Sequence, residues 1–305
     1  MSERAIILEC AWRNPVEAFA PFANAPSSVL LHSSDVAPGR GRWSYLCIDP
    51  FSVVTSKNGT ARIDGRPVAG KPFDVLRSLM KNFKGSVNDT RNPALPPFLG
   101  GLAGFFAYDL GADLERLPPK RAPFAVDDQA CPDLHLGLYD TVAAFDHHTE
   151  RLLVISSGLP EAADAPRRKR AKARAEALAA RLADRPPLPP LADDPLTDHI
   201  SSNFTAEGYR QAVARVVDYI HAGDIFQANL SQRFEAHLRP AATPFTLYRR
   251  LTQESPAPYA AYVAFDEGAL LSSSPESFLR LEDGCVTTAP IKGTRPRGET
   301  PTKDR

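Results

Sequence analysis

A proline-rich segment divides this chain into two unequal parts. It reads Arg185-Pro-Pro-Leu-Pro-Pro-Leu-Ala-Asp-Asp-Pro195. Proline fixes φ and lacks a backbone N–H, so neither a helix nor a central strand can run through such a sequence. The segment therefore predicts a stiff linker. We expect an N-terminal domain over residues 1–158, a basic helix with this linker over 159–200, and a second domain over 201–305.

Hydrophobic periodicity on both sides of the linker predicts an α+β fold. Before it, residues Pro72–Phe83 have helical spacing among short apolar runs. After it, Thr205 can cap an amphipathic helix, and two hairpin signals follow at Asp266-Glu-Gly268 and Asp283-Gly284. Antiparallel hairpins and single helices favour an antiparallel two-sheet core with flanking helices, incomplete at the C-terminus.

Other segments carry more specific expectations. The apolar runs Leu136–Phe145 and Arg151–Ser156 predict a hairpin, and Ile225–Phe234 predicts a strand. Gly100-Gly-Leu-Ala-Gly104 lacks one glycine of a dinucleotide fingerprint and predicts a tightly packed strand. Residues 164–184 predict a helix with a narrow apolar stripe and a solvated basic face.

Composition excludes several classes of function. The 305 residues carry 36 basic and 36 acidic side chains, so no net field recruits nucleic acid or a membrane surface. The start lacks a signal peptide, and the most apolar stretch is too short to span a bilayer. The adjacent His147 and His148 are explained by a turn without a metal. The four cysteines are widely spaced, which favours reduced thiols in a cytoplasmic protein: Cys10, Cys47, Cys131 and Cys285.

A hairpin near the end of the chain brings an acid and an amine together. The β-prone runs Phe278–Leu281 and Cys285–Thr288 flank the Asp-Gly turn. Antiparallel pairing places Glu276, just before the first run, close to Lys292, just after the second. The pair can serve as a general acid and a nucleophile, or it can be an ordinary exposed ion pair.

A lysine amine attacks only in its neutral form, so its pKa of about 10.4 must fall. Two sources for this are expected: the like charges of Arg295 and Arg297 nearby in the sequence, and burial of the ammonium beneath a ligand. Glu276 could then protonate a leaving hydroxyl.

Three motifs in order resemble those of the chorismate-utilising enzymes. They are Gly223-Asp-Ile-Phe-Gln-Ala-Asn-Leu-Ser-Gln-Arg-Phe234, Ser274-Pro-Glu-Ser-Phe278 and Pro290-Ile-Lys-Gly-Thr294. This family includes anthranilate synthase component I, aminodeoxychorismate synthase component I, and the isochorismate and salicylate synthases. The resemblance covers the whole chain and implies the anthranilate-synthase-component-I-like fold.

Lys292 selects a branch of the family. Aminodeoxychorismate synthases carry lysine at this place in the motif, whereas anthranilate synthases usually carry alanine. The resemblance implies synthesis of 4-amino-4-deoxychorismate from chorismate and ammonia, in p-aminobenzoate and folate biosynthesis. Lys292 would attack C2 as nucleophile, Glu276 would act as general acid at the C4 hydroxyl, and Gly293 and Thr294 would contact substrate.

Gln227 supports the same branch. Isochorismate synthases have a similar segment with a lysine at this position, and that lysine activates water. An amide has no proton-accepting pKa near neutrality, so Gln227 favours ammonia as the incoming group. It can also be a surface residue of a strand. Two alternatives stay open: anthranilate synthase component I, and an inactive fragment that binds tryptophan or an amidotransferase.

The first domain contains a second candidate site. Leu30-Leu-His-Ser-Ser34 resembles the Leu-Leu-Glu-Ser segment of anthranilate synthases, with His32 in place of glutamate. Ser255-Pro-Ala-Pro-Tyr259 resembles the segment on the other wall of the tryptophan pocket. Ser33, Pro258 and Tyr259 would line that pocket, or form a packing contact between domains.

The resemblance also implies a partner and a metal. The sequence lacks the Gly-x-Cys-x-Gly elbow of glutamine amidotransferases, so a separate amidotransferase subunit is expected to supply ammonia, in a heterodimer. Family members continue for well over a hundred residues, which carry the Mg²⁺-binding glutamates. We therefore expect the Mg²⁺ ligands beyond Arg305, and no activity from this chain alone.

Overall fold

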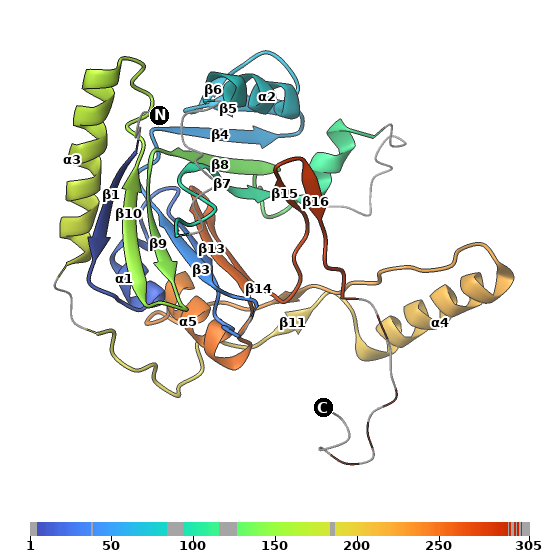
Figure 1. The fold of residues 1–305 in the computed structure, drawn as a ribbon. Coiled ribbons are helices and arrows are strands. Elements are labelled where there is room, and N and C mark those ends of the chain that lie inside the picture. Colours follow the sequence, from blue (N-terminus) through green and yellow to red (C-terminus); the bar gives the residue numbers. More distant parts are fainter. Residues whose placement is uncertain are drawn as a thin grey trace. The chain divides into compact units, whose positions relative to one another are not determined.

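The computed structural model describes residues 5–37, 39–83, 94–115, 127–183 and 187–291, together with residues 293, 296, 298 and 300 (Figure 1). The chain forms two compact units. The first comprises Met1–Pro189 and Tyr248–Arg305, and the second comprises Pro190–Leu247. The predicted three-part division stays a prediction, but the segment after Tyr248 belongs to the same unit as the N-terminal part.

An antiparallel seven-stranded sheet forms the centre of the first unit. Five of its strands precede the proline-rich segment and two follow it. Of the last two, β13 pairs with β2, and β14 pairs with β13. In sheet order the strands are β1 (Ile6–Cys10), β10 (Arg151–Ser156), β9 (Thr141–Asp146), β3 (Trp43–Cys47), β2 (Val29–His32), β13 (Tyr259–Phe265) and β14 (Gly268–Ser274).

A second antiparallel sheet of five strands belongs to the same unit. Its order is β6 (Arg66–Pro67), β5 (Thr60–Ile63), β4 (Ser52–Lys57), β8 (Leu134–Tyr139) and β7 (Gly101–Phe106). Gly104 of β7 has φ +151°, and a Cβ there would lie 2.0 Å from the carbonyl oxygen of His135. The glycine run is therefore a tightly packed strand, as predicted.

The two sheets share their core through β8, whose residues are all buried. Tyr139 belongs to the apolar cluster that also holds Val142 of β9 and Val263 of β13. Leu134, Leu136 and Leu138 face the opposite way and pack with Leu76 of helix α2 (Pro72–Phe83). Successive β8 side chains point to opposite faces of the smaller sheet, which therefore packs against α2 on one face and against the larger sheet on the other.

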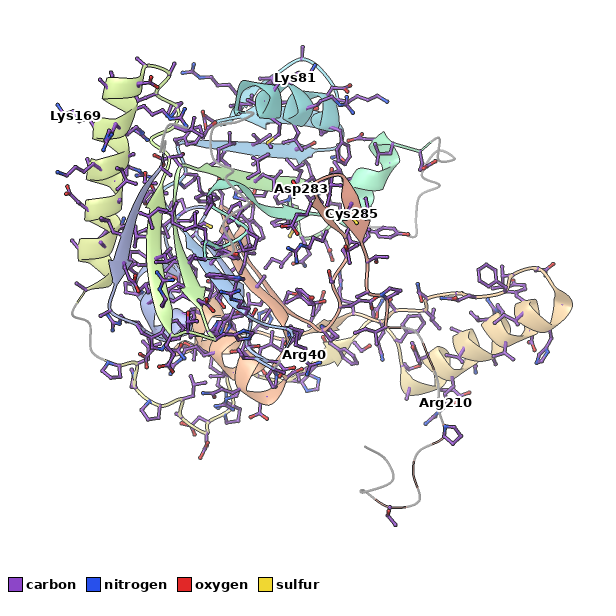
Figure 2. The ribbon with its side chains drawn as sticks, in the orientation of Figure 1. Arg40, Lys81, Lys169, Arg210, Asp283 and Cys285 are labelled. Atoms are coloured by element: carbon purple, nitrogen blue, oxygen red, sulfur yellow. The ribbon has the colours of Figure 1, made fainter. Side chains whose placement is uncertain are left out.

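Helix α3 (Asp164–Leu182) packs against β1, β10 and β9 (Figure 1). Its buried positions are Arg167, Ala171, Ala175, Leu178 and Leu182, and the helix matches the prediction. The basic face is only partly solvated, which corrects the expectation. Lys169 points outward (Figure 2), but the Arg167 guanidinium is buried and donates from Nε to the Ser157 carbonyl oxygen at 2.8 Å.

Shorter elements complete the first unit. Helix α1 (Pro15–Phe19) is capped by Asn14, whose Oδ1 accepts from the backbone N–H of Val16 at 2.9 Å. The others are η1 (Ala20–Phe22), η2 (Tyr108–Asp113) and the hairpin β15 (Arg280–Glu282) with β16 (Cys285–Thr287). Helix α5 (Pro244–Glu254) begins in the second unit and ends in the first.

The second unit contains α4 (Ala206–Ala222) and the short pair β11 (Ser201–Ser202) and β12 (Phe234–Glu235). Thr205 caps α4 as predicted, since its Oγ1 accepts from the Gly208 N–H at 3.0 Å. Gly223 ends the helix with φ +83°. The strand predicted over Ile225–Phe234 is wrong, because within this range only Phe234 belongs to a strand, where it pairs with Ser202.

The α+β class with an antiparallel two-sheet core and flanking helices is confirmed. One strand assignment needs correction. The run Leu136–Phe145 is two strands, β8 and β9, which belong to different sheets and separate at Asp140. The hairpin with Arg151–Ser156 is formed by β9 and β10. Within the described residues, every helix is too short or too polar to cross a bilayer.

Candidate functional site

The predicted hairpin at the end of the chain is present. Glu282 pairs with Cys285, so the turn contains two residues, Asp283 and Gly284, with φ of 49° and 80° (Figure 2). Positive φ at both positions is the geometry of a type I′ turn, which the Asp-Gly dipeptide favours. Beyond the paired residues, the Thr288 hydroxyl donates to the Phe278 carbonyl oxygen at 3.0 Å. The two legs of the hairpin therefore stay together as far as Phe278, two residues after Glu276.

Glu276 lies in the irregular segment that connects β14 to β15, and it is half-buried. Its backbone N–H donates to the Ser274 Oγ at 3.3 Å, and this hydroxyl donates to the Glu276 carbonyl oxygen at 3.1 Å. Both hydrogen bonds are local, and Ser274 is the last residue of a strand of the larger sheet. The end of β14 and these two hydrogen bonds therefore fix the position of the Glu276 backbone.

The predicted nucleophile cannot be placed beside this acid. Lys292 and Thr294 lie outside the described residues, as do Arg295 and Arg297. Gly293 is described and exposed, and no atom would lie within 4 Å of a Cβ added to it. The hairpin that motivated the pairing is confirmed, but the pairing of Glu276 with Lys292 stays a prediction.

Gln227 lies in the second unit, in the irregular segment that follows α4, and its side chain is exposed. It is not part of a strand, so the surface-strand interpretation of this residue is wrong. Its role toward substrate stays a prediction.

Two of the three residues predicted to line a tryptophan pocket are in contact. Ser33 is buried, and its Oγ lies 2.8 Å from the Trp43 carbonyl oxygen and 3.1 Å from that of Pro258. One hydroxyl proton can serve only one of these acceptors at a time. Tyr259 follows at the start of β13 and is 49% exposed. Ser33 directly follows β2 and Pro258 directly precedes β13, and their contact suits either a ligand pocket or a packing contact.

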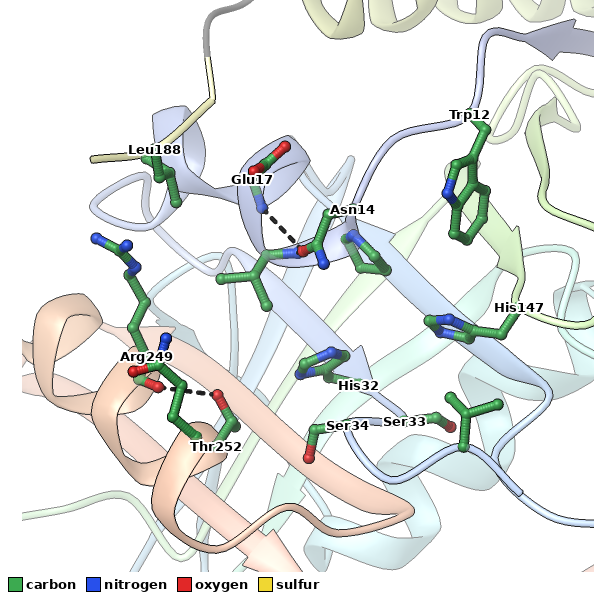
Figure 3. Close-up of a pocket in the computed structure, with 14 residues that line it drawn as sticks. Trp12, Asn14, Glu17, His32, Ser33, Ser34, His147, Leu188, Arg249 and Thr252 are labelled. Atoms are coloured by element: carbon green, nitrogen blue, oxygen red, sulfur yellow. Dashed lines mark hydrogen bonds between the residues drawn. The ribbon is translucent and has the colours of Figure 1, made fainter. Parts of the chain in front are cut away.

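A cavity of about 430 Å³ opens beside Ser33 (Figure 3). Five separate segments line it, and neither Pro258 nor Tyr259 is among them. Its wall includes Trp12, Glu17, His32, His147 and Arg249. The volume falls within the range of small-molecule sites, which is about 300–1,000 Å³.

Hydrogen bonds hold the two histidines of this cavity. The His32 Nδ1 lies 3.2 Å from the Tyr248 hydroxyl, and the His147 Nε2 lies 2.7 Å from the Ser44 hydroxyl. Burial, together with the nearby His147, lowers the pKa of His32 to about 4. Burial also lowers the pKa of His147. Both imidazoles are therefore neutral near pH 7.

The described residues do not provide a metal centre. They contain no group of three or more histidine, cysteine or carboxylate side chains that could hold an ion. The Mg²⁺ implied by the resemblance therefore finds no ligand set here, and we derive no chemical step through it.

Sequence patterns did not reveal the cavity. His32 and His147 stood out as residues, but the five lining segments meet only through the folding of β2, α1 and α5. A motif signal would need those residues to be near one another in the sequence. Here Trp12 and Arg249 are separated by most of the chain.

Comparison with known proteins gives the family. Residues 31–305 match the model of the chorismate binding enzymes. The chain belongs to this family.

Curated relatives fall into two activities. Anthranilate synthase component 1 of Thermus thermophilus is 37% identical over 295 residues, which cover 95% of this chain and 59% of that protein. Aminodeoxychorismate synthase component 1 of Salmonella typhimurium is 35% identical over 289 residues, covering 94% of this chain and 59% of that protein. Identity at this level does not separate the two activities.

A solved structure shows the same fold. The crystal structure of anthranilate synthase component I from Streptococcus pneumoniae superposes with a TM-score of 0.64 at 28% identity. The match covers 83% of this chain and 54% of that one. Against the two curated relatives named above, this chain spans 59% of the length of each.

Proposed function

We propose that this protein is the synthase component that converts chorismate and ammonia into 4-amino-4-deoxychorismate. Membership of the chorismate binding enzymes supports chorismate as the substrate. The single observation that carries the finer assignment is Lys292 within Pro290-Ile-Lys-Gly-Thr294, because the motif offers an amine where the anthranilate branch usually has alanine. The two-residue hairpin turn supports this role, since it keeps β16, the strand that precedes the motif, alongside the leg that leads back to Glu276.

In the proposed reaction, the neutral Lys292 amine forms a bond to C2 of chorismate. Both ring double bonds shift, and the C4 hydroxyl leaves as water with a proton from Glu276. Ammonia then attacks C4, the two double bonds shift back, and the lysine leaves as its neutral amine. The new ammonium group returns one proton to the Glu276 carboxylate. The net change is chorismate plus ammonia to 4-amino-4-deoxychorismate plus water, and the enzyme returns to its starting state.

Glu276 suits the role of acid for a structural reason. Its half-buried side chain starts from a turn whose backbone is fixed by the Ser274 hydroxyl at the end of β14. A carboxyl group positioned in this way can deliver a proton without first ordering its own backbone. Gln227, Gly293 and Thr294 are proposed substrate contacts, and Mg²⁺, with ligands beyond Arg305, is proposed as the metal.

A second candidate is anthranilate synthase component I, favoured by the 37% identity to the Thermus thermophilus protein. The two products differ in mass, because 4-amino-4-deoxychorismate keeps the enolpyruvyl group and anthranilate does not, so product analysis decides between them. A third candidate is a binding fragment without turnover, in which Ser33, Pro258 and Tyr259 hold tryptophan.

The test is product analysis by chromatography and mass spectrometry. The protein, at the length that its reading frame encodes, is incubated with chorismate, an ammonium salt and Mg²⁺. We expect 4-amino-4-deoxychorismate. Anthranilate as the main product would assign the protein to the other branch, and binding of tryptophan without any turnover would favour the binding fragment.

A further inference from the structure

The hydroxyl of Ser274 contacts the backbone of Glu276 at two points. Its Oγ accepts from the Glu276 N–H at 3.3 Å and donates to the Glu276 carbonyl oxygen at 3.1 Å. A serine hydroxyl has one donor and two acceptor sites, so both hydrogen bonds can form at once. The two bonded groups belong to the peptide units on either side of the Glu276 Cα. One side chain therefore restrains the backbone of Glu276 on both sides.

The position of Ser274 is itself set by the larger sheet. It is the last residue of β14, and it pairs with Tyr259 of β13 in the antiparallel ladder. Leu270, four residues earlier, packs against the apolar cluster of the core. Because alternate residues of a strand share a face, Ser274 points to the same side as Leu270. Pro275 follows, and its ring fixes its own φ and favours an extended backbone at Ser274.

The three serines that end β14 differ in what they contact. Only the Ser274 hydroxyl bonds to Glu276. The Ser273 hydroxyl donates to the Ser255 carbonyl oxygen instead. Ser272 shares the face of Ser274 and is likewise half-buried, but within the described part of the chain its hydroxyl has no hydrogen bond. Ser272 is therefore a matched control for the loss of a hydroxyl on this strand.

We propose that Ser274 is a positioning residue for the acid of the proposed reaction. Acting through the Glu276 backbone, it aligns the carboxyl group with the C4 hydroxyl of chorismate as that group leaves. The inference rests on the proposed function, because it takes Glu276 as the general acid. Alignment matters in the transition state, where the proton moves, and much less while the substrate is only bound.

Steady-state kinetics with chorismate and an ammonium salt test this role in the protein at the length that its reading frame encodes. Ser274→Ala should lower kcat about tenfold or more and change KM less than about twofold, since a small misplacement of a reacting group acts on the chemical step. Ser272→Ala should behave like the unaltered protein.

A matched pair of variants separates the hydroxyl from the shape of the side chain. Ser274→Thr and Ser274→Val have nearly the same shape, and both suit a strand, but only threonine keeps the hydroxyl. Ser274→Thr should retain most of kcat, and Ser274→Val should lose about as much as Ser274→Ala. Thermal unfolding shows that each variant is folded, and this pair decides the question if Ser274→Ala does not fold.

Two further measurements show whether Ser274 acts through Glu276. In the Glu276→Gln background, Ser274→Ala should cause no additional loss of turnover, because no acid is left to align. Amide hydrogen exchange, followed by NMR, needs no turnover. The Glu276 amide should exchange about tenfold or more faster in Ser274→Val than in Ser274→Thr, because it loses its acceptor.

The outcomes separate this inference from the proposed function. If Glu276→Gln loses turnover while Ser274→Ala and Ser274→Val keep it, Ser274 does not position the acid, and the proposed function stands. Equal exchange of the Glu276 amide in the threonine and valine variants also overturns the inference alone, as does an equal loss of kcat in both. If the unaltered protein forms no product, or Glu276→Gln keeps its turnover, the proposed function fails and the inference fails with it.

Discussion

At the scale of single residues, His32 has the most informative environment. It is 7% exposed and its ring touches Tyr248, and both burial and the neighbouring His147 disfavour its protonation. Its pKa falls from 6.5 to about 4. Between these values the unfolded chain takes up a proton at this residue and the folded chain does not.

We therefore expect acid to destabilise the fold through His32. Stability falls as pH drops below about 6.5, and the loss is complete below about pH 4. From pH 8 to pH 4.5, the free energy of unfolding should fall by about 2–3 kcal/mol more in the unaltered protein than in His32→Gln. Urea unfolding at several pH values measures this difference.

The control for this prediction is His199→Gln, because His199 is exposed. Its pH profile should follow that of the unaltered protein. If the free energy of unfolding of His32→Gln falls with acid as much as that of the control, the buried imidazole does not contribute to the acid sensitivity.

Lys292 carries the second residue-scale prediction. Lys292→Ala should lower kcat for aminodeoxychorismate synthesis by about a hundredfold or more and change KM little, because covalent attack matters only in the transition state. Steady-state kinetics with ammonium salts measure both constants. Lys172→Ala, at an exposed lysine of α3, is the matched control.

Residual anthranilate formation by the Lys292→Ala variant would still agree with the proposal, since the other branch carries alanine here. Peptide mapping by mass spectrometry after incubation with chorismate should locate an adduct on Lys292. Retained turnover in the variant, with no adduct in the unaltered protein, would make this lysine structural.

Some residues of the candidate sites could be predicted from sequence, and others could not. The Asp283-Gly284 turn follows from local pattern, because the Asp-Gly dipeptide favours a tight hairpin turn. The contact of Ser33 with Pro258 followed only from resemblance. The Glu17 and Arg249 cavity followed from neither, because tertiary packing alone brings its segments together.

At the scale of elements, helix α3 is held by an acid at a strand junction. Asp140 separates β8 from β9 and is fully buried. Its Oδ1 accepts from an Arg174 guanidinium nitrogen at 3.0 Å, and its Oδ2 lies 3.4 Å from the Arg170 Nε. Both arginines also donate to backbone carbonyl oxygens, those of Asp49 and Leu159. The basic face of α3 is thus a structural contact to the larger sheet.

Removing this charge should loosen the helix from the sheet. Asp140→Asn should lower the free energy of unfolding by about 3 kcal/mol, because it leaves two partly buried guanidinium groups without their carboxylate. Urea unfolding measures the change. Glu176→Gln removes only the exposed pair with Lys172, at 3.8 Å, and should cost less than about 0.5 kcal/mol. Equal losses in the two variants would show that Asp140 does not anchor α3.

The same junction explains one wrong strand assignment. Leu136–Phe145 reads as one apolar run, and both β8 and β9 are buried on both faces, so periodicity cannot show where one strand ends. The partners that accommodate a buried Asp140 come from α3 and cannot be seen in the local sequence. The strand prediction for Ile225–Phe234 is wrong for a different reason. The segment has β propensity, but in this structure only its last residue has a partner strand.

At the scale of the whole molecule, the larger sheet is built from segments on both sides of the proline-rich linker. Strand β13 pairs with β2 over Ala260–Val263 and Val29–His32, which places β13 in the same sheet as the N-terminal strands. Helices, hairpins and the fold class could be predicted because they depend on local pattern. This pairing could not, since a linker indicates where regular structure stops but not which strands meet afterwards.

The last prediction concerns the source of ammonia. The curated relatives are named as component 1, and these 305 residues contain no Gly-x-Cys-x-Gly elbow. We expect the protein, at the length that its reading frame encodes, to form product from ammonium salts on its own. With glutamine, it should form product only when a separate amidotransferase is added. Glutamine labelled with ¹⁵N at the amide shows whether its nitrogen reaches the product, by mass spectrometry. Labelled product from the purified protein and glutamine alone would contradict the need for a second subunit, because a chain without a glutaminase nucleophile has no group to release that nitrogen.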